Sequence, residues 1–128
     1  MEIDPRMKYS KTHEWVLVEG NTAKIGVSDY AQQQLTDIVF VELPEVGSRV
    51  EKGKAFGVIE SVKAVEDVYA PISGKVLKKN EDLINKPELI NEDPYNAWLI
   101  EVSIENKSEL DDLMDAEGYK KFLENEGH

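Results

Sequence analysis

Apolar residues along the chain fall into short runs, separated by turn-forming residues, that predict a mainly β protein. The runs at 15–19 and 22–27 flank Gly20-Asn21, a pair typical of a hairpin turn. A dense β-branched run at 37–43 ends at Pro44, which breaks it. A short run at 48–50 precedes a turn, and the remaining strands are predicted at residues 55–59, 65–70, 74–78 and 97–104.

Helical signals are fewer and lie around these strands. Ser28 is a good N-cap for a short helix at 29–35. Residues 80–94 are rich in Asn, Asp, Glu and Pro, which predicts turns and one short helical piece. Beyond residue 104 the apolar side chains recur at helical spacing, which predicts two amphipathic helices. Ser108 and Asp111 are spaced as the N-cap and N3 acid of the first of these helices.

The length of the chain indicates how these elements are grouped. A chain of 128 residues, 41% of them hydrophobic, fits one domain with a modest core. We therefore expect a single domain over residues 1–128, divided into an N-terminal tail at 1–6, a β core at 7–104 and a C-terminal helical segment at 105–128.

Composition narrows the range of partners and chemistry. The formal net charge of -11 argues against duplex nucleic acid and anionic membranes as partners, because both are bound by clusters of Lys and Arg. The absence of cysteine excludes disulfides and thiolate catalysis. His13 and His128 have no third ligand spaced with them, so no metal site is predicted. The chain shows neither a membrane-spanning apolar run nor a targeting segment, and a cytoplasmic location is expected.

Lys63 is the most informative residue, because it lies between two predicted strands. A lysine in that position sits at a hairpin tip with its amine toward water, where other enzymes can reach a group attached to it. The nearby acids Glu60, Glu66 and Asp67 do not provide the apolar or cationic surroundings of a Schiff-base lysine. The chain also shows no nucleophile–base pair, metal set or phosphate loop, so it is predicted to be a carrier and not an enzyme.

A short internal repeat surrounds this hairpin. Residues 46–52 resemble residues 72–78, and within them Val50 and Val76 each lie 13 residues from Lys63. Two similar strands placed in this way suggest two related halves of a flattened barrel.

Several motifs along the chain, taken in sequence order, resemble those of one known family. Residues 57–64, Gly-Val-Ile-Glu-Ser-Val-Lys-Ala, and residues 70–76, Ala-Pro-Ile-Ser-Gly-Lys-Val, resemble the lipoyl attachment region of the glycine cleavage system H protein family. Thr36 and Ala97 stand where glycine is common in the family, which affects local turns and not the attachment region. The resemblance covers about residues 7 to 123, with further motifs at 9–16, 25–32, 37–44, 87–95 and 98–100.

The resemblance implies both a fold and a role. The fold is a barrel-sandwich hybrid of two small antiparallel sheets, mostly β, with short peripheral and C-terminal helices. The role is to carry an aminomethyl group on lipoate that is covalently attached to Lys63. The implied partners are a pyridoxal-phosphate glycine decarboxylase, a tetrahydrofolate-dependent aminomethyltransferase, the flavin enzyme dihydrolipoamide dehydrogenase and a lipoylating enzyme. The acidity of the chain suits docking to basic rims on such enzymes, although acidity alone also serves solubility.

Four further residues are candidates for contacts with the arm or with partners. Glu60 lies three residues before Lys63 and is a candidate for recognition by the lipoylating enzyme. The resemblance suggests that a loaded arm folds back against the protein, with Thr12, Glu14 and Asp67 as candidate docking residues, since an amine favours a nearby carboxylate. The other interpretation is that these are ordinary exposed side chains.

Other carrier functions share the same attachment chemistry. Biotinyl sites favour methionine on both sides of the lysine, whereas Val62 and Ala64 stand here. Lipoyl domains of 2-oxoacid dehydrogenases usually place Asp before the lysine and lack such long flanks. A lipoyl donor to other proteins, or a carrier in sulfur metabolism, shares the attachment motif, and the sequence leaves that alternative open.

Overall fold

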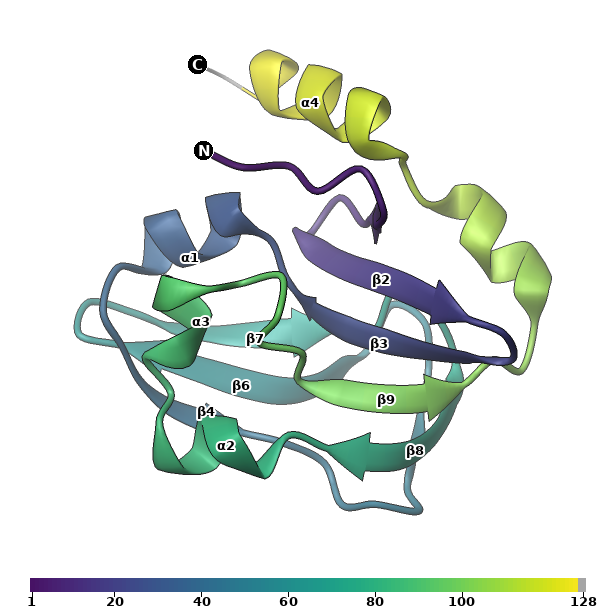
Figure 1. Ribbon diagram of the computed structural model, residues 1–128, viewed down its shortest axis with the longest axis horizontal. Helices are drawn as coiled ribbons and strands as arrows, with labels where there is room; N and C mark the ends of the chain where they lie inside the picture. The colour runs from purple at the N-terminus through teal and green to yellow at the C-terminus, as the bar shows by residue number, and fades with distance from the viewer. Residues whose placement is uncertain (127–128) are drawn as a thin grey trace.

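The computed structural model describes residues 1–126, which form two antiparallel sheets with short helices around them (Figure 1). This confirms the predicted fold class. The larger sheet has six strands in the order β1 (Lys8–Tyr9), β2 (Glu14–Glu19), β3 (Thr22–Val27), β9 (Ile100–Ser103), β8 (Gly74–Lys79) and β5 (Arg49–Val50). The smaller sheet has three, in the order β4 (Ile38–Glu42), β6 (Ala55–Ser61) and β7 (Val65–Tyr69).

The helices are short, and all of those described except α3 are capped by polar side chains. Ser28 caps α1 as predicted, since its Oγ accepts a hydrogen bond from the Ala31 N–H at 3.2 Å. Asp115 caps the C-terminal helix in the same way. Within residues 1–126, none of the helices is both long enough and apolar enough to span a membrane. The helices are α1 (Asp29–Leu35), α2 (Glu81–Asn85), α3 (Leu89–Glu92), the 3-10 helix η1 (Lys107–Asp112) and α4 (Ala116–Asn125).

Two of the helical predictions are wrong, one in the number of helices and one in the residue at which a helix begins. Residues 80–94 contain two short helices and not one, because Asn80 caps the first and a second turn begins after Pro87. The first C-terminal helix starts at Asn106, whose Oδ1 accepts from both the N–H and the hydroxyl of Ser108. Ser108 therefore donates to the cap instead of being the cap.

Residues 47–76 form one long hairpin whose tip is at 61–64. Near the tip β6 pairs with β7, placing Glu60 opposite Val65. At the far end, the hairpin base, β5 pairs with β8, and Val50 lies opposite Gly74. The Gly47 N–H donates to the Val76 carbonyl at 2.8 Å. The two segments of the internal repeat therefore pair with each other across the base.

The core lies between the two sheets and extends under the N- and C-terminal segments. Residues predicted as a tail are packed in place, since the Tyr9 hydroxyl donates to the Asp4 carbonyl at 2.8 Å and Asp4 is buried. The rings of Tyr9 and Tyr119 stack with centroids 4.3 Å apart, which joins α4 to the start of the larger sheet. Figure 1 shows α4 and the N-terminal segment together beside β2.

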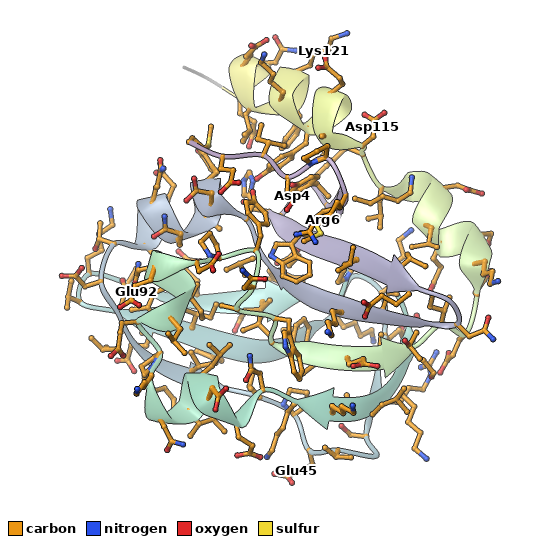
Figure 2. All side chains as sticks on the ribbon, viewed as in Figure 1. Asp4, Arg6, Glu45, Glu92, Asp115 and Lys121 are labelled. Carbon is orange, nitrogen blue, oxygen red and sulfur yellow. The ribbon has the colours of Figure 1, made fainter. Side chains whose placement is uncertain are left out.

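Charged side chains are mostly at the periphery. Figure 2 shows Glu45, Glu92 and Lys121 pointing away from the ribbon, and all three are exposed. Asp4 is an exception at the N-terminal segment, where the exposed Arg6 guanidinium contacts the buried Asp4 carboxylate at 2.8 Å. That pair helps to hold the N-terminal segment in place.

Glycine is often a turn residue, but Gly74 has a different role. It lies in β8 with no positive φ. A Cβ at this position would lie 1.9 Å from the Ser103 carbonyl oxygen. The residue is therefore glycine because β9 passes too closely for a side chain.

Candidate functional site

The hairpin tip is held by one serine side chain and by backbone hydrogen bonds. The Ser61 N–H donates to the Ala64 carbonyl at 2.8 Å. The buried Ser61 Oγ accepts from the backbone N–H groups of Lys63 at 3.2 Å and Ala64 at 3.1 Å. The Val62 N–H donates to the Asp37 carbonyl at 3.0 Å, which attaches the tip to the start of β4. The turn is fixed although its two central side chains are exposed.

Lys63 lies at this tip, where the sequence predicts it. Its backbone N–H is engaged with Ser61, while its side chain is exposed. The backbone is thus fixed and the amine is accessible, as an attachment lysine requires. Sequence reasoning did not identify Ser61 as the residue that shapes the turn, although serine at a strand end is a known turn signal.

A cleft of about 440 Å³ begins beside Lys63 and brings together four of the five predicted site residues. Thr12, Glu14, Lys63 and Asp67 all line it. Its apolar wall is made by side chains from β3, α1 and the hairpin, namely Val27, Ala31, Leu35, Ile59 and Val68. Glu60, the fifth predicted residue, does not line the cleft.

Glu14 is the buried carboxylate of this cleft, so its interpretation as an ordinary surface acid is wrong. The residue is 2% exposed. Its Oε1 accepts from the Ser10 hydroxyl at 2.6 Å and from the Thr12 hydroxyl, and its Oε2 accepts from the Tyr69 N–H at 3.1 Å. Burial raises the pKa of Glu14, and the hydrogen bonds from Ser10 and Thr12 oppose that rise. Glu14 therefore joins β2 to β7 and gives the cleft its acidic wall.

His13 also lines the cleft, and sequence reasoning did not place it there. It has a positive φ of 76°, which is uncommon for a residue with a side chain. Its Nδ1 lies 2.8 Å from the Tyr119 hydroxyl, which lies 2.7 Å from the Ser28 Oγ. Burial lowers the pKa of His13, an effect that the carboxylate of Glu126 opposes. The ring links the cleft to α4.

Glu60 lies on the opposite, outward face of the three-stranded sheet. Strand pairing places it between Phe40 of β4 and Val65 of β7. Because directly paired residues point to the same side of a sheet, these three side chains form one row. Glu60 is thus separated from the cleft but close to Lys63 in the chain, which suits contact with an approaching protein.

Metal chemistry has no basis in this site. Residues 1–126 contain no group of three or more His, Asp and Glu side chains placed to hold a metal ion. The cleft instead offers an acidic wall, hydroxyl groups and an apolar wall next to an exposed amine. Such a site can receive a flexible arm that carries an amine but has no residues arranged for catalysis of its own.

Comparisons with known proteins agree with this geometry. Residues 7–126 match the family described as Glycine cleavage H-protein. The chain is 54% identical to the glycine cleavage system H protein of Carboxydothermus hydrogenoformans, covering 99% of each chain. It is 53% identical to that of Thermoanaerobacter pseudethanolicus, covering 98% of this chain and 100% of the relative.

A solved structure gives the same result for the fold. The crystal structure of a glycine cleavage system H protein from Mycobacterium marinum is similar with a TM-score of 0.82 and 31% identity. The match covers 98% of this chain and all of the other. With an exposed lysine on a hairpin and matches over nearly its whole length, the chain belongs to the glycine cleavage H-protein family, the non-catalytic lipoyl carriers of the glycine cleavage system.

Proposed function

We propose that Lys63 carries the lipoyl group and that the cleft beside it, lined by Thr12, Glu14 and Asp67, receives the loaded arm. The observation that supports this most strongly is the position of the lysine. It combines a fixed backbone with an exposed side chain at the rim of the cleft. An arm attached at this point can turn outward to a partner enzyme or inward to the cleft.

The residues present fit a lipoyl arm. The apolar wall of Leu35, Ile59 and Val68 suits a hydrocarbon chain. Glu14 and Asp67 supply negative charge for the amine of the cargo. When bound, the lipoyl group supplies a strained five-membered disulfide ring that opens to a dithiol, while the protein supplies position. The hydroxyl groups of Ser10 and Thr12 hold Glu14 in place.

The partners follow from membership of the glycine cleavage system. The other proteins of that system are the partners of this chain. In finer detail, we propose that it takes the aminomethyl group from a pyridoxal-phosphate glycine decarboxylase and delivers it to a tetrahydrofolate-dependent aminomethyltransferase. A flavin-containing dihydrolipoamide dehydrogenase then reoxidises the dithiol. We further propose a cytoplasmic location, which the bacterial origin of the relatives supports.

The attachment site is tested by intact mass after incubation with lipoate, ATP and a lipoylating enzyme. Wild-type protein is expected to gain one lipoyl mass. Lys63→Arg keeps the positive charge but lacks an acylatable amine, so it is expected to gain none. Lys78→Arg, at an exposed lysine of β8, is the matched control and is expected to gain the mass normally. A lipoyl mass on Lys63→Arg would show that the site is elsewhere.

A further inference from the structure

Four large apolar side chains are exposed around the hairpin tip. Val39 is 53% exposed, Phe40 50%, Val62 67% and Val65 65%. We call these four residues the tip patch. A cluster of exposed apolar side chains is a mark of interaction surfaces, whereas isolated ones are ordinary.

Strand pairing brings the tip patch together. Phe40, Glu60 and Val65 form a row across the outer face of the three-stranded sheet. The hydrogen bond from the Val62 N–H to the Asp37 carbonyl holds Val62 beside the start of β4, the strand that contains Val39. The patch therefore spans all three strands and ends at the lysine.

The tip patch is separate from the core. The core side of the same sheet is formed by Val41, Ile59 and Val68, which are buried. The core is thus complete without Phe40 and Val65. Their apolar side chains do not contribute to the packing between the sheets, so a role outside the folded chain explains them better.

The charges around the patch indicate which kind of partner fits. Glu60 stands between Phe40 and Val65, and the next row along the sheet places Glu42 beside Val58. A second copy of this chain on the patch would bring acids against acids, which is unfavourable. A partner with an apolar recess bordered by Lys or Arg would be complementary in both respects.

We propose that the tip patch is the docking surface for the enzyme that acylates Lys63. This inference rests on the proposed attachment at Lys63. An enzyme that acylates the amine must bring the lysine itself into its active site, so it must cover the residues next to the tip. Enzymes that act on the far end of the finished arm are separated from the tip by the length of the arm. The adjacency of the patch to Lys63 therefore favours the acylating enzyme as its occupant.

The first test is the kcat/KM for lipoylation of the unmodified protein by a purified lipoate–protein ligase with lipoate and ATP. Phe40→Ser and Val65→Ser are each expected to lower kcat/KM about tenfold, mainly through KM, as loss of an interface anchor does. Leu77→Ser, at a side chain of β8 that is 38% exposed, is the matched control and is expected to be unchanged. Far-ultraviolet circular dichroism and the thermal midpoint establish that each variant is folded. Wild-type rates for both folded patch variants would overturn the docking surface.

The second test separates this enzyme from the other partners. Phe40→Ser is lipoylated to completion with excess ligase, and reduction of its arm by dihydrolipoamide dehydrogenase, with NADH as the electron donor, is then measured. The rate is expected to equal that of lipoylated wild type. A loss as large as that in lipoylation would overturn the assignment to the acylating enzyme. Failure of the proposed attachment site would appear differently, as a lipoyl mass on Lys63→Arg with the patch intact.

Discussion

The tip and the base of the long hairpin are built in opposite ways. At the tip, one buried serine side chain and a few backbone bonds hold the turn, and the lysine and valine at its centre are exposed. At the base, side chains of the C-terminal segment bind both strands of the hairpin. The same hairpin is thus firmly anchored at one end and displayed at the other.

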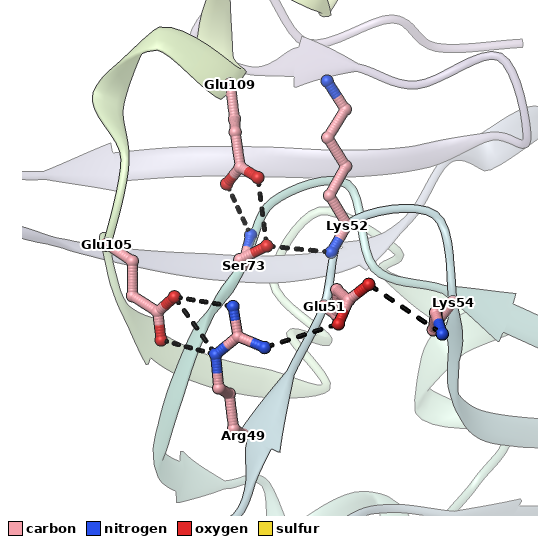
Figure 3. A network of polar contacts seen from close by, with 7 residues as sticks. All are labelled: Arg49, Glu51, Lys52, Lys54, Ser73, Glu105 and Glu109. Carbon is pink, nitrogen blue, oxygen red and sulfur yellow. Dashed lines mark hydrogen bonds and ion pairs between the residues drawn. The ribbon is translucent and has the colours of Figure 1, made fainter.

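Figure 3 shows the contacts at the base. Glu109 of η1 accepts from the N–H of Ser73 at 2.8 Å and from its hydroxyl at 3.0 Å. The Ser73 Oγ in turn accepts from the Lys52 N–H at 3.0 Å. Arg49 binds Glu105 through two nitrogen atoms. Changes at the base should therefore alter stability, whereas changes at the tip should alter lipoylation.

The largest expected effect is that of Gly74→Ala at the base. The added Cβ would lie 1.9 Å from the Ser103 carbonyl oxygen, so β8 and β9 must separate locally. We expect the free energy of unfolding to fall by about 3 kcal/mol, the upper end of ordinary overpacking. Urea unfolding measures it. Gly118→Ala in α4 is the control, because its added Cβ would meet only the end of the Asp115 side chain, at 3.2 Å. A similar loss of unfolding free energy in both variants would contradict the explanation.

Gly74 also shows that contacts between residues far apart in the sequence are not predicted from local patterns. The strands around it follow from local apolar runs, and both the hairpin and the position of Lys63 follow from those strands. The approach of Ser103 depends on a strand far along the chain, so a glycine at 74 is interpreted from sequence as a turn. Glu14 is similar: its charge suggests the surface, whereas its burial results from donors at Ser10, Thr12 and Tyr69, which the fold brings together.

The hairpin tip that carries Lys63 could be predicted from the sequence for a different reason. It consists of residues that are close in sequence, so its motif and its geometry coincide. The cleft is lined by the loop before β2, by helix α1 and by the hairpin. These segments are far apart in the sequence, so no local sequence pattern predicts that they come together. The resemblance to the family was therefore needed to propose Thr12, Glu14 and Asp67 as arm-docking residues, which stays a proposal.

The next largest effect is expected for Glu109→Ala. The change removes the acceptor of the buried Ser73 N–H and hydroxyl, and an unsatisfied buried donor costs about 1–3 kcal/mol. The free energy of unfolding should fall by that amount, while the rate of lipoylation at Lys63 stays at the wild-type value. Asp111→Ala, at an exposed acid of the same segment, is the control and should be nearly neutral. A lipoylation rate that fell together with stability would show that the tip depends on the base.

A smaller, pH-dependent effect is expected for Glu14→Gln in the cleft beside the tip. Burial raises the pKa of Glu14 above its ordinary value of 4.5. The folded protein then binds this proton more tightly than the unfolded chain does, so the carboxyl group costs stability as pH rises from 4.5 through the pKa of the folded state. The glutamine variant lacks this titration. Urea unfolding between pH 4 and 8 should show the stability of wild type, relative to the variant, falling with pH and then levelling off; a relative stability that rises with pH would contradict the burial argument.

The smallest effect is expected for Arg49→Gln at the base. Although Arg49 binds Glu105 with two nitrogen atoms and holds the pKa of that carboxyl below its ordinary value, both side chains are exposed. Water and salt screen such a pair, and ordering two long side chains opposes the attraction. The thermal midpoint and the lipoylation rate should both match wild type within error. A midpoint as low as that of Glu109→Ala would mean that the base is held by its exposed ion pairs as much as by the buried bonds to Ser73.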